Sequence, residues 1–184
     1  MMKDKRERLL YHEAGHAVAA MAYDLPFMAL LQSGDSAGML CLGSISETQL
    51  KDKNFCENYT IVSLAGAAAE SIHGHPQDWM QSFSNGLGAD DFRKALSLGL
   101  MKDFADILTH YKRAYDCLKE NWSAVEKTVS ELRNNYMLSE AEVRSIAGFE
   151  KEPVHSEEAM IEQLLNRPCP NPAVGLFDKK NFGF

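Results

Sequence analysis

This sequence has no surplus of basic residues. It contains 19 Lys and Arg against 26 Asp and Glu, which gives a formal net charge of −7 at pH 7. Proteins that bind nucleic acid usually present a positively charged face to the phosphates, and this composition offers no general basic footprint. We therefore expect no nucleic-acid partner.

The chain also lacks closely spaced cysteines and long apolar runs. No CxxC pair occurs, so neither a cysteine zinc site nor a dithiol redox motif is expected. The most apolar stretch, residues 17–31, is interrupted by Asp24 and Pro26 and is too short to cross a bilayer. The charged start, MMKDKRERLL, contains no apolar core long enough for a signal peptide. We therefore expect a cytoplasmic protein with free thiols and no membrane segment.

Proline and polar clusters divide the chain into two parts. A length of 184 residues suits one domain with a short appendage. Four of the six prolines lie in residues 150–184, in a stretch that reads as an extended arm with a short helix around residues 157–166. We place a domain at residues 1–148 and a partly extended or flexible C-terminal extension at residues 149–184.

Helical periodicity dominates the first of these parts. It predicts helices over residues 5–23, 46–72 with a break near residues 53–54, 90–102, 104–121, 122–135 and 139–148. Asp4, Ser46 and Ser139 are each followed three residues later by Glu or Gln, the spacing of a capping box. Two short apolar segments, residues 27–32 and 38–45, predict a small antiparallel sheet. The predicted fold class is mainly α (α+β), with the β-element near the metal motif described next.

The segment YHEAGHAVAA carries an HExxH motif on the first predicted helix. His12 and His16 are four residues apart, about 40° around a helix axis, so both imidazoles can bind one metal ion. Glu13 is rotated by about 100° from His12, within reach of a water on that ion. Zinc acidifies such a water, and a neighbouring carboxylate can accept its proton. The pattern predicts a zinc site with a built-in base.

A catalytic zinc site usually has three protein ligands and one open position. The motif is not followed by the GxxH spacing of metzincins, and no other histidine has a comparable context. A downstream carboxylate is therefore expected as the third ligand. The candidates are Glu70, Asp78, Asp90 and Asp91.

The segments YHEAGHAVAA, IVSLAGAAAESIHG and GADDFRKAL occur in this order along the chain. Together they resemble the peptidase domain of FtsH-type ATP-dependent zinc metalloproteases, over roughly residues 6–147. That family carries HEAGHA on one helix, a Leu-Gly-Arg-Ala-Ala-Glu stretch on a second and an Asn-Asp-Leu step at the start of a third. The resemblance implies a helical, zincin-like domain that hydrolyses peptide bonds with Zn²⁺.

The same resemblance assigns roles to individual residues. It implies that His12 and His16 bind Zn²⁺ and that Glu13 is the catalytic carboxylate. The family's third ligand is the aspartate of its Asn-Asp-Leu step, which reads DDF here and makes Asp91 the counterpart. Glu70 matches the family's glutamate and is expected to accept a hydrogen bond from a ligand imidazole. The bare sequence also permits Glu70 as third ligand, so that alternative stays open.

The chain departs from the family pattern in several places. Ala67 stands where the family has an arginine, and GLGADD does not match the family's Thr-Gly-Ala cleanly. The metal motif begins at residue 12, which leaves no room before it for the family's ATPase module and membrane anchor. We therefore expect a standalone peptidase domain that acts on short peptides or unfolded protein segments. A separate ATPase or adaptor is a conceivable partner, and the sequence does not indicate an oligomeric state.

The alternative function is a non-catalytic zinc-binding or protein-interaction module with the same fold. The presence of Glu13 argues against it, because a structural zinc site has no use for a base and is closed by four ligands. The segment 38–45 could serve as an edge strand for an extended peptide. The loop 73–90 adds two histidines, expected to be exposed, and three large apolar residues that line a pocket or pack in the core. These residues are His73, His75, Trp79, Met80 and Phe83.

Overall fold

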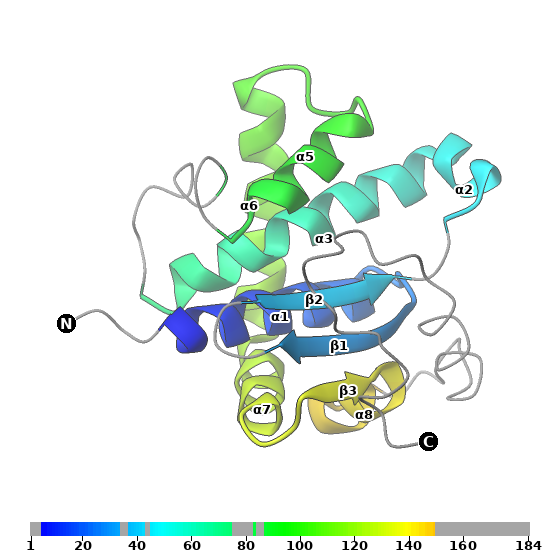
Figure 1. The fold of residues 1–184 in the computed structure, drawn as a ribbon. Helices are drawn as coiled ribbons and strands as arrows, with labels where there is room; N and C mark the ends of the chain where they lie inside the picture. The colour runs from blue at the N-terminus through cyan, green and yellow to red at the C-terminus, as the bar shows by residue number, and fades with distance from the viewer. Residues whose placement is uncertain (1–4, 34–36, 43–44, 75–82, 84–86, 150–184) are drawn as a thin grey trace.

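The computed structural model describes residues 5–33, 37–42, 45–74, 83 and 87–149. It is mainly helical with a small antiparallel sheet, as predicted (Figure 1). The described elements, in chain order, are α1 (Lys5–Ala22), β1 (Phe27–Ser33), β2 (Ala37–Leu42), α2 (Glu47–Lys51), α3 (Lys53–Ile72), α5 (Ala89–Ser97), α6 (Phe104–Glu120), α7 (Trp122–Leu132), β3 (Met137–Ser139) and α8 (Glu140–Ala147).

Helix α1 lies at the centre of the molecule. It runs behind the sheet, with α3 on one side and α7 on the other (Figure 1). Every residue from Leu9 to Met21 is buried. A helix buried on all sides must be apolar almost everywhere, and the acidic and basic residues in this stretch are His12, Glu13 and His16. Buried ionisable groups need polar partners, so we expect other residues to form hydrogen bonds or ion pairs with these three side chains.

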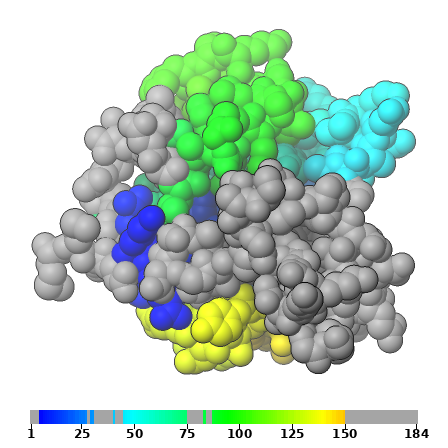
Figure 2. Space-filling view, in the orientation of Figure 1, coloured from blue at the N-terminus to red at the C-terminus, as the bar shows by residue number. Residues whose placement is uncertain are grey.

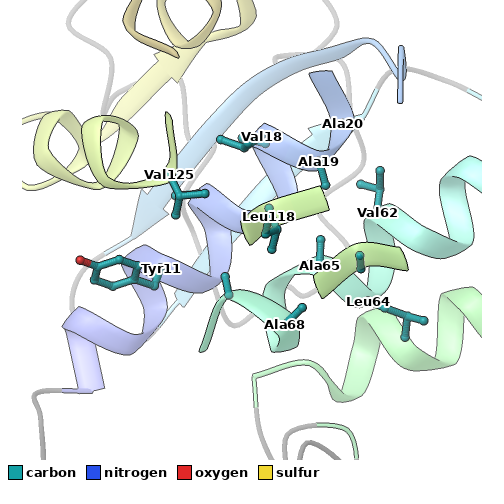
Figure 3. Packing of buried hydrophobic residues seen from close by; sticks show 14 of the residues in the cluster. Tyr11, Val18, Ala19, Ala20, Val62, Leu64, Ala65, Ala68, Leu118 and Val125 are labelled. Carbon is teal, nitrogen blue, oxygen red and sulfur yellow. The ribbon is translucent and has the colours of Figure 1, made fainter. Parts of the chain in front are cut away.

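Small residues allow α1 and α3 to pack closely. A Cβ atom added to Gly15 would lie 2.6 Å from the Cβ atom of Ala69 and 2.9 Å from the carbonyl oxygen of Ala65. Figure 3 shows Ala19 of α1 and Ala65 and Ala68 of α3 among the side chains that fill the space between these helices. The alanine-rich segment therefore packs on the HEAGH helix, as its composition indicated.

The sheet has the strand order β2-β1-β3 and is antiparallel throughout. The sequence did not predict β3, which pairs Leu138 with Leu30 of β1. A three-residue strand is too short to show an alternating pattern, and it forms because Leu138 is buried beside the β1 strand. The second strand ends at Leu42, whereas residue 45 was the predicted end. This order leaves β2 at one edge of the described sheet.

Local capping signals explain most helix boundaries. The side chain of Ser46 caps α2, that of Asp52 caps α3 and that of Ser139 caps α8, and Ser46 and Ser139 form capping boxes. The prediction that one helix would continue to Lys102 is wrong. Helix α5 ends at Ser97 because Gly99, with a φ of 70°, turns the chain in the left-handed region, and a new helix starts after the cap at Asp103.

Some predictions fall on residues outside the described ranges. These are the cap at Asp4, the residues His75, Asp78, Trp79 and Met80, and nearly all of the C-terminal extension, residues 150–184. Phe149, the last described residue, packs against the core. Of the helices that the structure describes, none is both long and apolar enough to span a bilayer.

Candidate metal centre

Three side chains from two helices converge beside the α1–α3 interface. His12 and His16 of α1 are one turn apart, and their Nε2 atoms lie 3.0 Å from each other. The Oδ2 atom of Asp91, in the first turn of α5, is 3.4 Å from His12 Nε2 and 3.3 Å from His16 Nε2. Both histidines are buried and Asp91 is partly buried. These three residues form a group that can hold a metal ion.

The outward-facing nitrogen of each imidazole has an acceptor from α3. The Nδ1 atom of His12 lies 2.7 Å from Oε1 of Glu70, and the Nδ1 atom of His16 lies 2.7 Å from the carbonyl oxygen of Val62. A carbonyl oxygen only accepts, so His16 donates from Nδ1, and the carboxylate of Glu70 assigns the same role to Nδ1 of His12. Both Nε2 atoms are therefore the positions that can bind a metal ion.

The donor set and its spacing fit zinc. Zinc ligand atoms sit about 2.0–2.1 Å from a tetrahedral ion, which separates them from each other by about 3.3 Å. The separations here, 3.0, 3.3 and 3.4 Å, match that triangle. Two imidazole nitrogens and one carboxylate oxygen are also the ligand types that zinc accepts, and three protein ligands leave one position open.

A glycine on α3 makes room for the two imidazoles. A Cβ atom on Gly66 would lie 2.5 Å from the Nε2 atoms of both His12 and His16. Such contacts are far too short, so any side chain at this position would push the rings out of their present positions. The space for the site therefore depends on the missing side chain of this one residue.

Replacing Gly66 with alanine should abolish or strongly weaken zinc binding without unfolding the protein. Alanine suits a helix interior better than glycine by about 0.5–1 kcal/mol, so the helical content measured by circular dichroism should persist. The measurement is zinc affinity by competition with a chelator dye. Unchanged affinity would show that the added methyl group does not reach the ligand atoms.

The charges of the cluster support a cation at this point. Burial lowers the pKa of His12, but its hydrogen bonds with Asp91 and Glu70 outweigh this effect and raise the pKa to about 10. Burial raises the pKa of Asp91, yet the charge of His16 and hydrogen bonds from both histidines hold it well below its ordinary value. Without a metal, the carboxylates thus favour the protonated form of His12. A divalent cation bound here would supply that positive charge in place of the proton.

Glu13 is buried beside this cluster. Desolvation raises the pKa of its carboxyl group, against the lowering effect of His12 and His16. The charge of Asp91 raises this pKa further and that of Lys94 lowers it. A carboxylate with a raised pKa is a better proton acceptor than an ordinary surface glutamate.

Glu70 lies on the outer side of His12. Its Oε1 atom faces His12 Nδ1, while Nε of Arg8 donates to its Oε2 atom at 2.9 Å. Burial raises the pKa of Glu70, but the hydrogen bonds and charges of His12 and Arg8 bring it below the ordinary value. The structure therefore places Glu70 against the nitrogen that faces away from Asp91.

Sequence reasoning missed three residues around the centre. Lys94 donates to Oδ1 of Asp91 at 2.9 Å, which leaves Oδ2 for the histidines. Arg8 contacts Glu70, and Gly66 borders the imidazoles. Each lies three or four residues from a predicted site residue, the spacing at which helical residues share a face. That spacing was the signal available in the sequence.

Other candidate residues lie elsewhere. Asp90 is beside Asp91 in the chain, but it pairs with Arg93 at the surface and does not join the cluster. His73 is half-buried rather than exposed, because it ends α3 and stacks on the ring of Tyr11 with a centroid distance of 3.5 Å. Phe83 is buried and stacks on a neighbouring phenylalanine, so it belongs to the core.

No protein-family model and no curated protein matches the sequence.

Proposed function

We propose that this protein is a zinc metalloendopeptidase of the HExxH type. His12, His16 and Asp91 would hold the ion, and Glu13 would act as the base. One observation carries the proposal: both Nδ1 atoms are engaged by acceptors, so both Nε2 atoms converge with one oxygen of Asp91 at zinc-like spacing. The resemblance of three sequence segments to FtsH-type peptidases supports the same assignment.

The proposal gives each of these residues a role. His12, His16 and Asp91 would hold a zinc ion, which would supply a Lewis acid for a peptide carbonyl and for a water molecule, whose pKa such ions lower towards about 7. Glu13 takes the proton from the attacking water and passes it to the leaving amine. Glu70 and the carbonyl of Val62 hold the two imidazoles in the required tautomer. Lys94 holds the second oxygen of Asp91.

The proposed substrate is an extended peptide or an unfolded protein segment. Strand β2 lies at an edge of the described sheet and packs on α1, the helix that carries the motif. An edge strand offers unpaired backbone groups to which an extended chain can add. Such binding depends on the peptide backbone and does not select a folded substrate.

Metal removal tests the proposal directly. The chelator-treated protein should take up one zinc per chain, and it should cleave an unstructured polypeptide only when zinc is restored. Metal content by elemental analysis and cleavage by mass spectrometry give the two measurements. Uptake of zinc without cleavage would favour the non-catalytic module, and a failure to bind zinc would contradict the centre itself.

A further inference from the structure

Arg8 links the candidate centre to the surface end of α1. It lies four residues before His12, so both side chains project from the same face of the helix. Its Nε donates to Oε2 of Glu70 at 2.9 Å, and its Nη2 donates to the same oxygen. The other oxygen of Glu70 accepts from His12 Nδ1 at 2.7 Å. The N-terminal part of α1 reaches the surface between α5 and α7 (Figure 2).

This ion pair differs from the other inter-helix arginine pairs. Arg113 pairs with Glu57 of α3, and there the glutamate side chain is 32% exposed. In the Arg8–Glu70 pair the glutamate is only 3% exposed. Exposed pairs contribute little because water already solvates both charges. A buried carboxylate instead depends more strongly on its charged partners, and removing Arg8 would take away one of the positive charges that stabilise Glu70.

Two donors on one oxygen also fix the orientation of the carboxylate. With Oε2 held by the planar guanidinium, Oε1 is directed at His12. The orientation of that imidazole in turn sets where its Nε2 points. A lysine cannot reproduce this arrangement, because an ammonium group presents a single point charge instead of a rigid fork.

We infer that Arg8 is a positioning residue for the metal centre, acting on His12 through Glu70. The expected effect of Arg8 on zinc affinity rests on the proposed function. Its effect on the orientation of the His12 ring does not. Nothing in the HExxH pattern requires an arginine at this position, so Arg8 is a feature of this chain's own arrangement.

Two measurements test the role of Arg8. Arg8→Met should weaken zinc binding by up to about 10–100-fold, the usual effect of losing a ligand's outer partner such as Glu70, and Arg8→Lys should lie between Arg8→Met and the wild type. In the metal-free protein, NMR of the His12 ring should show a protected Nδ1–H in the wild type and its loss in Arg8→Met. Arg113→Met removes an arginine–glutamate pair elsewhere on α3 and should change neither measurement.

A double variant separates positioning from general stability. If Arg8 acts through Glu70, Arg8→Met added to Glu70→Gln should cause no further loss of zinc affinity. Additive losses, or an unchanged His12 signal and zinc affinity in Arg8→Met, would overturn the inference. If the wild type shows the protected His12 Nδ1–H signal but takes up no zinc, the proposed function is contradicted. The NMR comparison of the wild type with Arg8→Met would still decide the role of Arg8.

Discussion

Replacing Glu13 with glutamine should lower the rate of peptide cleavage by about 10²–10⁴-fold, the usual contribution of a general base. Glutamine has nearly the same shape as glutamate but cannot accept a proton. Because Glu13 is not one of the three converging ligands, zinc content should stay the same. The expected result is thus a metal-loaded protein with a low kcat, measured on a quenched fluorescent peptide.

Glu7→Gln provides a matched control for this experiment. Glu7 lies on the same helix, but its carboxylate pairs with Arg133 and is not one of the converging ligand groups. Its replacement should leave both cleavage and zinc binding unchanged. If Glu13→Gln cleaves the peptide as fast as the wild type, Glu13 is not the base. If Glu13→Gln instead loses zinc, Glu13 contributes to metal binding.

The parts of the fold that could be predicted are those that local sequence determines. The caps at Ser46 and Ser139 were evident because each capping box lies within four residues, and the structure forms both. The HExxH motif is equally local, since His12 and His16 share one helix face. Strand β3 escaped prediction because its formation depends on pairing with β1, more than a hundred residues earlier in the chain.

The sequence predicted which residues could belong to the candidate site, but not which of their atoms contact one another. His12 interacts with Glu70 and Asp91, which are 58 and 79 residues away in the chain. Which carboxylate faces Nδ1 and which faces Nε2 is decided by the crossing of α1, α3 and α5, and no local pattern encodes that crossing. The contributions of Gly66 and Arg8 have the same origin, since each acts across the α1–α3 interface.

Substitution distinguishes the roles of the Asp91 and Glu70 carboxylates, because the two replacements should lower zinc affinity to different extents. Asp91→Asn should weaken zinc binding by well over about 100-fold, because a ligand oxygen is replaced by a neutral amide. Glu70→Gln should cost only about 10–100-fold, since a partner of His12 is altered while all three ligands remain. Isothermal titration of the metal-free proteins with zinc measures both effects on one scale.

Asp90→Asn is the matched control, because it makes the same change one residue earlier, at the exposed carboxylate paired with Arg93. It should leave zinc affinity unchanged. The order of the two losses is decisive, because Oδ2 of Asp91 lies within 3.4 Å of both Nε2 atoms whereas Glu70 contacts Nδ1 of His12. A larger loss for Glu70→Gln than for Asp91→Asn would reverse these roles and make Glu70 the third ligand.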